Sequence, residues 1–153
     1  MQGNAAKRAE VIMDTHLGII KSKDPKTISV LRDAGNAIGL KLTVDGRAAE
    51  FLLHLQENDY RVSIFDYGGV DSDSLTWVRL IRRLRPKLPL ILVGDHLDKS
   101  VGAQMYQEGI FYLGLRPLDA KVLVDVLQAA VRSSNSTRRK ETKGTTSRTS
   151  EQR

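Results

Sequence analysis

The chain has 153 residues, of which 41% are hydrophobic, and a formal net charge of +6. This length suits one domain with a buried core. The absence of cysteine excludes disulfides and thiolate chemistry and agrees with a reducing compartment. No apolar run approaches the roughly 20 residues of a membrane helix, and no apolar segment follows the first charges as in a signal peptide. We therefore expect a cytoplasmic protein without membrane contact.

The positive charge is concentrated at the C-terminal end of the chain. Residues 133–153 carry six Lys or Arg against two Glu, and they include no hydrophobic residue. Such a segment buries too little surface to offset the entropy of ordering, so we expect a disordered basic tail or linker. The chain accordingly divides into an N-terminal lead-in (1–15), a folded domain (16–132) and this tail (133–153).

The folded part alternates short apolar runs with stretches that have apolar residues at helical spacing. The predicted strands are residues 16–22, 40–44, 62–65, 90–93 and 110–114. The predicted helices lie within residues 25–39, 48–57, 71–85, 99–108 and 118–131. Five strand–helix pairs in alternation predict an α/β fold, a doubly wound sandwich around a parallel five-stranded sheet. Right-handed crossovers make 2-1-3-4-5 the natural strand order.

Asp66 is the first candidate site residue. It stands where the third predicted strand should end, and Gly68 and Gly69 allow a sharp turn directly after it. In an open parallel sheet, ligands and chemistry gather at the carboxyl ends of the strands. The simpler interpretation, which local sequence alone favours, is a carboxylate that caps the following turn.

The order and spacing of these segments resemble the receiver domain of bacterial two-component response regulators over about residues 16–132. The resemblance rests on Pro25 through Gly39 with Leu40-Lys-Leu after it, Ile64-Phe-Asp66, Asp73-Ser-Leu75 with Ile81-Arg82, Leu88 to Val93, and Glu108 to Pro117. It implies a flavodoxin-like fold with the strand order given above. It also places Asp66 at the family's phosphoacceptor position.

Five pocket positions depart from the pattern of that family. Ser22 and Lys23 stand where the family has the acidic pair that holds Mg²⁺, and Gly94 stands where it has a Thr or Ser after the fourth strand. Leu113 replaces the switch aromatic of the fifth strand, and Arg116 replaces the Lys before proline. Tyr112, the nearest aromatic, should lie on the opposite face of its strand. The resemblance is therefore to a degenerate, or pseudo-receiver, form.

These departures bear on metal binding. Hard divalent cations need several oxygen ligands, which one carboxylate does not supply. We therefore expect no metal cofactor and poor Mg²⁺ binding, with Lys23, Arg116 or both paired with Asp66 in place of the ion. His54 and His96 have no partners at ligand spacing, so they do not predict a metal site, and we expect His16 to be an ordinary strand-edge histidine.

The leading functional interpretation is a signalling module without enzymatic activity that binds a protein partner independently of phosphorylation. The alternative is a genuine phosphoacceptor, Asp66, in a two-component phosphorelay with a histidine kinase. A further alternative is a regulator whose basic tail makes weak nucleic-acid contact. By the resemblance, a partner or a second copy would bind the fourth helix, fifth strand and fifth helix (residues 99–108, 110–114 and 118–131).

The predicted third helix carries a row of arginines on its outer side. These are Arg79, Arg82, Arg83 and Arg85. Such a row is usually a solvated face, and the alternative is a docking patch for an acidic partner.

Overall fold

The computed structural model of the protein describes residues 16–69 and 73–151, and from residue 137 onward it describes the backbone only. Its core is one parallel sheet of five strands in the order β2-β1-β3-β4-β5, which confirms the predicted topology. The strands are β1 (His16–Lys21), β2 (Leu40–Asp45), β3 (Val62–Gly68), β4 (Leu90–Gly94) and β5 (Tyr112–Leu115). The order places β3 in the middle of the sheet, between β1 and β4.

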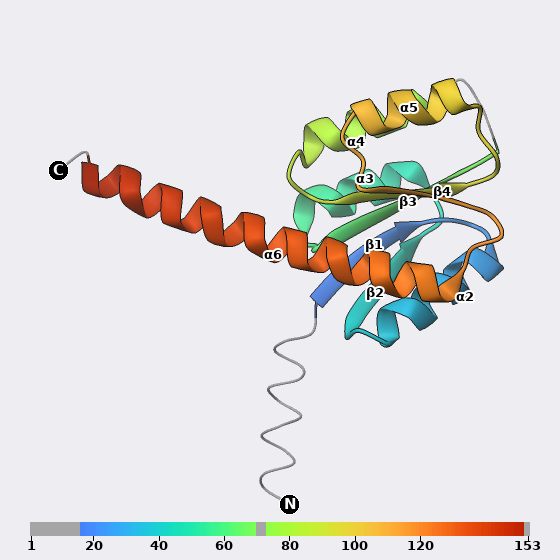
Figure 1. Ribbon diagram of the computed structural model, residues 1–153, viewed down its shortest axis with the longest axis horizontal. Coiled ribbons are helices and arrows are strands. Elements are labelled where there is room, and N and C mark those ends of the chain that lie inside the picture. Colours follow the sequence, from blue (N-terminus) through green and yellow to red (C-terminus); the bar gives the residue numbers. More distant parts are fainter. Residues whose placement is uncertain (1–15, 70–72, 152–153) are drawn as a thin grey trace, which may run out of the picture.

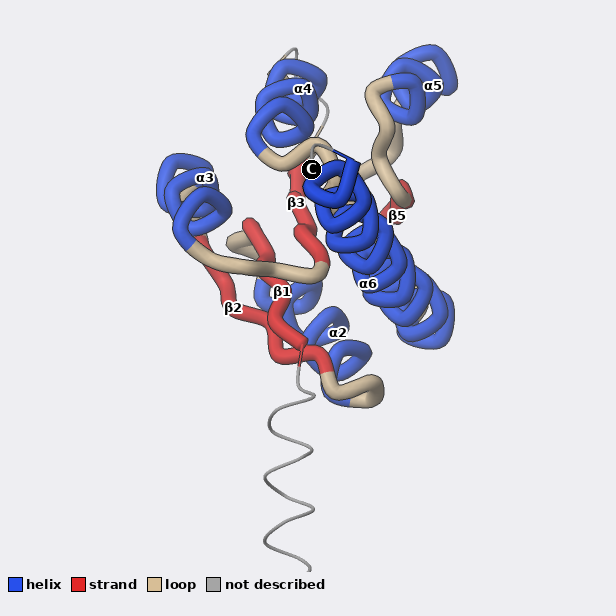
Figure 2. Tube along the Cα trace, turned by 90° about the vertical axis from the view of Figure 1, so that its left-hand side faces the viewer, coloured by secondary structure: helices blue, strands red, loops and turns tan. Residues whose placement is uncertain are grey.

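Helices cover both faces of this sheet, as expected for a doubly wound sandwich (Figures 1 and 2). They are α2 (Pro25–Asn36), α3 (Ala48–Glu57), α4 (Ser74–Leu84), α5 (Lys99–Gln107) and α6 (Ala120–Glu151). Helices α2 and α6 lie together on one face, and α3, α4 and α5 cover the other. None of the helices in the described part of the chain is both long and apolar enough to cross a membrane.

The core consists of two apolar clusters, one on each face of the sheet. Strand β4 is buried along its whole length, which explains why its sequence is a continuous apolar run instead of an alternating one. Successive side chains of a strand point to opposite faces. Leu113 accordingly packs against the cluster under α3, α4 and α5, while its neighbour Tyr112 packs against the α2 and α6 cluster.

The C-terminal helix differs from the prediction. Its backbone continues to Glu151, whereas the sequence predicts a disordered tail from Ser133 onward. The apolar stripe ends at Val131 as expected, and Ser134 is also buried. Extending an existing helix needs no new nucleus, so the backbone can remain helical where apolar packing has ended. The lead-in of residues 1–15 lies outside the described residues.

Candidate functional site

The Asp66 carboxylate lies at the carboxyl end of β3 and is surrounded by hydrogen-bond donors. Its Oδ2 accepts hydrogen bonds from Ser22 Oγ at 2.7 Å and from Arg116 Nη1 at 2.8 Å. Its Oδ1 accepts the backbone N–H of Gly68 at 2.8 Å. The residue is only 5% exposed. Both carboxylate oxygens are therefore engaged in a site that water hardly reaches.

Local backbone geometry makes this arrangement possible. The pairing of β3 with β4 shifts register between Asp66 and Gly68, and Gly68 has a φ of 71°, which favours glycine. This irregularity turns the Gly68 N–H back toward the carboxylate two residues before it. Gly68, one of the two glycines that the sequence marks as a turn, thus helps to hold Asp66 in place.

Arg116 follows β5 and reaches across the end of β4. Besides its bond to Asp66, its Nε donates to Asp95 Oδ1 at 2.9 Å and its Nη2 donates to the Gly68 carbonyl at 3.2 Å. The hydrogen bond to Asp66 is the largest factor that raises the pKa of Arg116, and burial opposes it. The planar guanidinium thus joins the ends of β3 and β4 with several N–H groups at once.

A third carboxylate, Asp24 at the start of α2, lies at the margin of the same site. Its Oδ2 accepts the Thr27 hydroxyl at 2.6 Å and is 3.9 Å from Arg116 Nη1. The Thr27 hydrogen bond is the main cause of the lowered pKa of Asp24. Asp24, Asp66 and Asp95 therefore surround a guanidinium, and the described residues include no group of three acidic or histidine side chains placed to hold a metal ion.

The second predicted cation, Lys23, does not reach Asp66. Lys23 is exposed, and a Cβ at Gly46 would lie 3.7 Å from its Cγ. Lys21 is nearer, because its Nζ donates to the backbone carbonyl of Asp66 at 3.3 Å and lies 5.1 Å from the centroid of the Phe65 ring. Of the two cations that the prediction offered as partners of Asp66, Arg116 makes the pair and Lys23 does not. The signal that points to Lys21 is the β1–β3 register, which places it beside Phe65.

Gly94 is explained by Tyr67, a residue that the sequence analysis missed. A Cβ at Gly94 would lie 2.3 Å from Cε2 and Cζ of the Tyr67 ring. The Tyr67 hydroxyl donates to the Asp95 carbonyl at 2.5 Å, and burial raises the pKa of Tyr67 to about 12. The ring thus fills the space that a side chain at position 94 would need. A large aromatic beside Asp66, opposite a glycine of the neighbouring strand, is the signal in the sequence.

Leu113 is half-buried beside an aromatic from another element. Its backbone N–H donates to the hydroxyl of Tyr106 on α5 at 3.2 Å, and Tyr106 is 50% exposed. An aromatic ring therefore stands next to β5 although the strand position itself is leucine.

The arginines of α4, and Arg85 directly after it, mostly bond to the protein's own surface. Arg79 donates to Glu108 at 2.8 Å. Arg82 and Arg85 each donate to backbone carbonyls. Arg83 differs from these three because it is exposed and has no such bond within the described residues. Because three of the four guanidinium groups are engaged, the structure favours a solvated face over a docking patch for an acidic partner.

Comparison with known proteins supports a receiver fold. No family model matches the chain. It is 28% identical over 102 residues to the DNA-binding transcriptional regulator NtrC of Escherichia coli K12, a match that covers 67% of this chain and 22% of the regulator. The chain thus spans about a fifth of the length of this relative.

Solved structures cover the folded part more completely. A CheY-like response regulator receiver domain protein from Methanospirillum hungatei matches with 14% identity and a TM-score of 0.71, covering 81% of this chain and 99% of that one. The signal receiver domain of an HD domain-containing protein from Pseudomonas fluorescens matches with 19% identity and a TM-score of 0.71, covering 82% and 93%. An orphan response regulator of H. pylori matches with 14% identity and a TM-score of 0.67, covering 76% of this chain and 97% of that one. The chain therefore has the fold of a CheY-like response-regulator receiver domain.

Proposed function

We propose that the chain is a cytoplasmic pseudo-receiver, a signalling module without enzymatic activity that binds a protein partner and does not use phosphorylation of Asp66. The observation that carries this proposal is the bond between Arg116 and Asp66. It fills the site of a receiver phosphoacceptor with an internal cation.

The engaged carboxylate is a poor phosphoryl acceptor. Phosphoryl transfer needs an attacking oxygen in line with the leaving group and positive charge on the transferred group, much of which Mg²⁺ supplies. Here Oδ2 of Asp66 already accepts two hydrogen bonds and Oδ1 accepts a third. A divalent ion or a phosphoryl group would have to displace the Arg116 guanidinium, and separating a buried pair is costly.

Signal transmission from Asp66 is also impaired. Gly94 has no hydroxyl to follow a phosphoryl group, and the Tyr67 ring occupies the space beside it. On β5, the half-buried Leu113 packs its side chain against the core cluster and offers no polar group. Both positions support a module that does not change state through Asp66.

The partner surface that we propose is formed by α5, β5 and the start of α6. Exposed large apolar side chains often mark interaction sites when they gather on one face. Four of the seven in the described part of the chain belong to this stretch: Tyr106, Phe111, Leu115 and Val122. By resemblance to the family, the partner would be a histidine kinase, another signalling protein or a second copy.

A titration with Mg²⁺ and beryllofluoride, a phosphoryl mimic, tests whether Arg116 keeps these ligands from the Asp66 site. We expect no saturable change in the amide resonances of Gly68 and Asp95 at millimolar Mg²⁺. In an Arg116→Gln variant the same titration should give measurable shifts, because the internal cation is gone. Saturable binding to the wild type would contradict the proposal and favour a working phosphoacceptor in a relay.

Self-association tests the proposed surface separately. Leu115 is 40% exposed on this surface, and Leu53 on α3 is 52% exposed away from it. If two copies bind through this surface, Leu115→Asp should abolish dimers in sedimentation experiments and Leu53→Asp should not. A monomeric wild type at high concentration would exclude the second copy as partner.

A further inference from the structure

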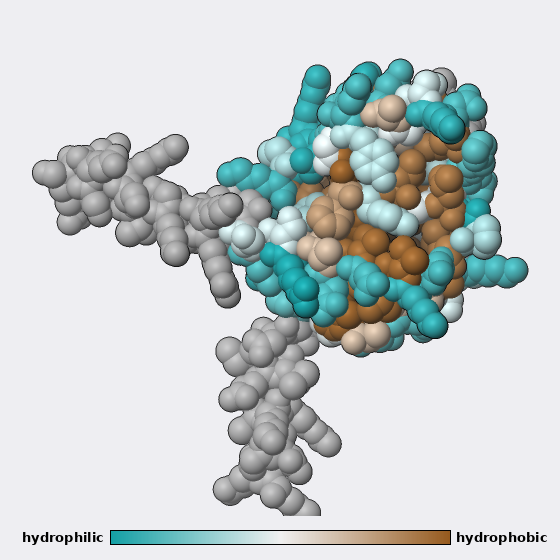
Figure 3. Space-filling model, viewed as in Figure 1, coloured by the Kyte–Doolittle hydropathy of each residue, from teal (hydrophilic) through white to brown (hydrophobic). Residues whose placement is uncertain are grey.

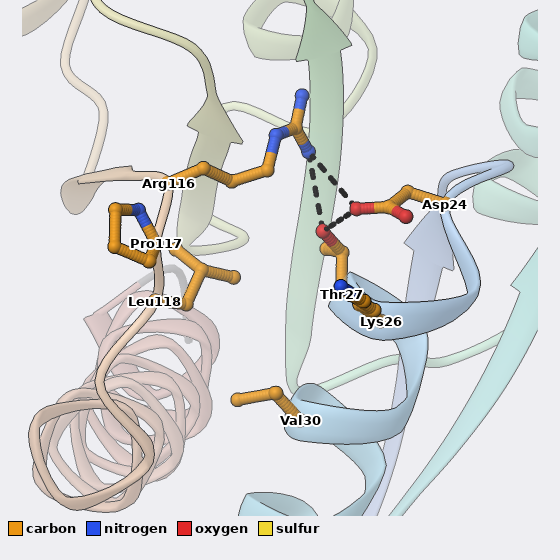
Figure 4. A pocket seen from close by; sticks show the side chains of 7 residues that line it. All are labelled: Asp24, Lys26, Thr27, Val30, Arg116, Pro117 and Leu118. Atoms are coloured by element: carbon orange, nitrogen blue, oxygen red, sulfur yellow. Dashed lines mark hydrogen bonds and ion pairs between the residues drawn. The ribbon is translucent and has the colours of Figure 1, made fainter.

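A pocket of about 440 Å³ opens beside the Asp66 site, between the start of α2 and the segment that joins β5 to α6 (Figure 4). This volume falls within the ordinary range for small-molecule sites. Asp66 is not among the residues that line this pocket. It therefore calls for an explanation of its own.

The walls of the pocket are mostly apolar. Val30 of α2 lies on one side, and Pro117 and Leu118 lie on the other (Figure 4). Figure 3 shows apolar surface over the region where α2 and the first turns of α6 lie. Such walls favour a ligand with an apolar body.

The polar end of the pocket is already internally bonded. Thr27 donates to Asp24 at 2.6 Å and accepts a hydrogen bond from Arg116 Nη1 at 3.2 Å. Figure 4 shows these three side chains joined in one network. A ligand would gain little by competing for groups that already satisfy one another.

Lys26 is the charged side chain of the lining that remains available. It is exposed, and its ammonium makes no hydrogen bond or ion pair within the described residues. Lys26 and Val30 are four residues apart on α2, so they share one face of the helix about one turn from each other. The pocket wall thus combines a cation with an apolar side chain at the distance of a helical turn.

We propose that this pocket binds a small amphipathic carboxylate, with its apolar body against Val30, Pro117 and Leu118 and its carboxylate on Lys26. The inference rests on the pocket alone and does not depend on whether Asp66 is phosphorylated.

Such a ligand would have a direct connection to the Asp66 site. Arg116 Nη1 bonds to Thr27 at the polar end of the pocket and to Asp66 on its other side. A ligand that orders the pocket would therefore favour the conformation in which Arg116 holds Asp66. The pocket would therefore give a small molecule a route to the Asp66 site.

Octanoate and 1-octanol are suitable probes, because they share one apolar chain and differ in charge. In ¹H–¹⁵N spectra of the full chain, octanoate should give saturable shifts of the Val30 and Leu118 amides, and octanol should bind more weakly. Lys26→Gln should weaken octanoate binding about two- to fivefold, as expected for an exposed charge pair, and leave octanol unchanged. Lys23→Gln is the matched control, an exposed lysine outside the pocket, and should have no effect.

A second variant tests the apolar wall. Val30→Thr keeps the shape of the side chain and replaces one methyl group with a hydroxyl, so it should weaken the binding of both probes while the protein stays folded. The proposal is overturned by the absence of saturable shifts around the pocket, by equal binding of octanol and octanoate, or by equal effects of the two lysine substitutions. The Mg²⁺ titration described above is unaffected by any of these outcomes.

Discussion

Arg116 Nη1 lies 2.8 Å from Asp66 Oδ2, across a separation of 50 residues in the chain. The side chain of Asp66 is 6% exposed and that of Arg116 is 22% exposed. A charge that is this buried is costly without a partner. The pair therefore explains how a strand-end aspartate stays charged in a nearly dry pocket.

Removing the cation should destabilise the fold. Arg116→Gln leaves Asp66 with the Ser22 and Gly68 donors only, and we expect a loss of about 1–3 kcal/mol in the free energy of unfolding. Urea denaturation measures this loss. Arg83→Gln, on an exposed site of α4, should change stability by less than about 0.5 kcal/mol. Equal effects of the two substitutions would show that the Arg116 pair contributes nothing.

Gly94→Ala should be poorly tolerated. The added Cβ would meet the Tyr67 ring at 2.3 Å, so we expect a cost of about 1–3 kcal/mol from overpacking. Gly102 on α5 is the control, because a Cβ there would lie 3.7 Å from Leu113 Cδ2, an ordinary contact. Gly102→Ala should stabilise the helix by about 0.5–1 kcal/mol.

A double-mutant cycle separates this clash from other effects of position 94. Tyr67→Ala leaves space at the end of β4, so Gly94→Ala should cost much less in that background than in the wild type. If the two substitutions are additive, Tyr67 is not what excludes a side chain from position 94.

Stability should depend on pH through His54. Its Nδ1 lies 2.8 Å from Asp45 Oδ2, a pair that the sequence analysis did not identify, and this hydrogen bond is the main cause of the raised pKa of His54. A raised pKa in the folded state stabilises the protein fully below the ordinary value of 6.5, and this contribution disappears as the pH rises through the folded value. Denaturation on both sides of this range should show the decrease, and Asp45→Asn should remove it. An unchanged pH profile in Asp45→Asn would assign the effect to another group.

The end of α6 should contribute little to stability. Its apolar stripe ends at Val131, and Ser134 is buried just beyond it. Truncation after Ser136 should therefore leave the melting temperature unchanged and reduce the helical signal in circular dichroism. A fall of several degrees would show that the C-terminal residues pack on the domain.

The sequence predicts the fold well because alternation of strands and helices and the right-handed crossover rule leave few topologies. The same strand order brings residues 66 and 116 to one edge of the sheet, so their pairing follows from topology. Contacts that depend on the register between strands cannot be predicted in this way. Tyr67 faces Gly94 only because β3 shifts register after Asp66, and Lys21 reaches Asp66 where Lys23 does not because β1 ends between them. The helical continuation of α6 beyond Val131 could not be predicted, because that segment has no apolar residues at helical spacing.

Mass spectrometry after incubation with a small phosphodonor and Mg²⁺ tests the central claim most directly. Wild type and Asp66→Asn are compared under the same conditions, because an acyl phosphate on Asp66 can form only in the wild type. We expect each of the two proteins to keep its unmodified mass. A phosphate adduct in the wild type that Asp66→Asn lacks would contradict the pseudo-receiver proposal and identify Asp66 as a working phosphoacceptor.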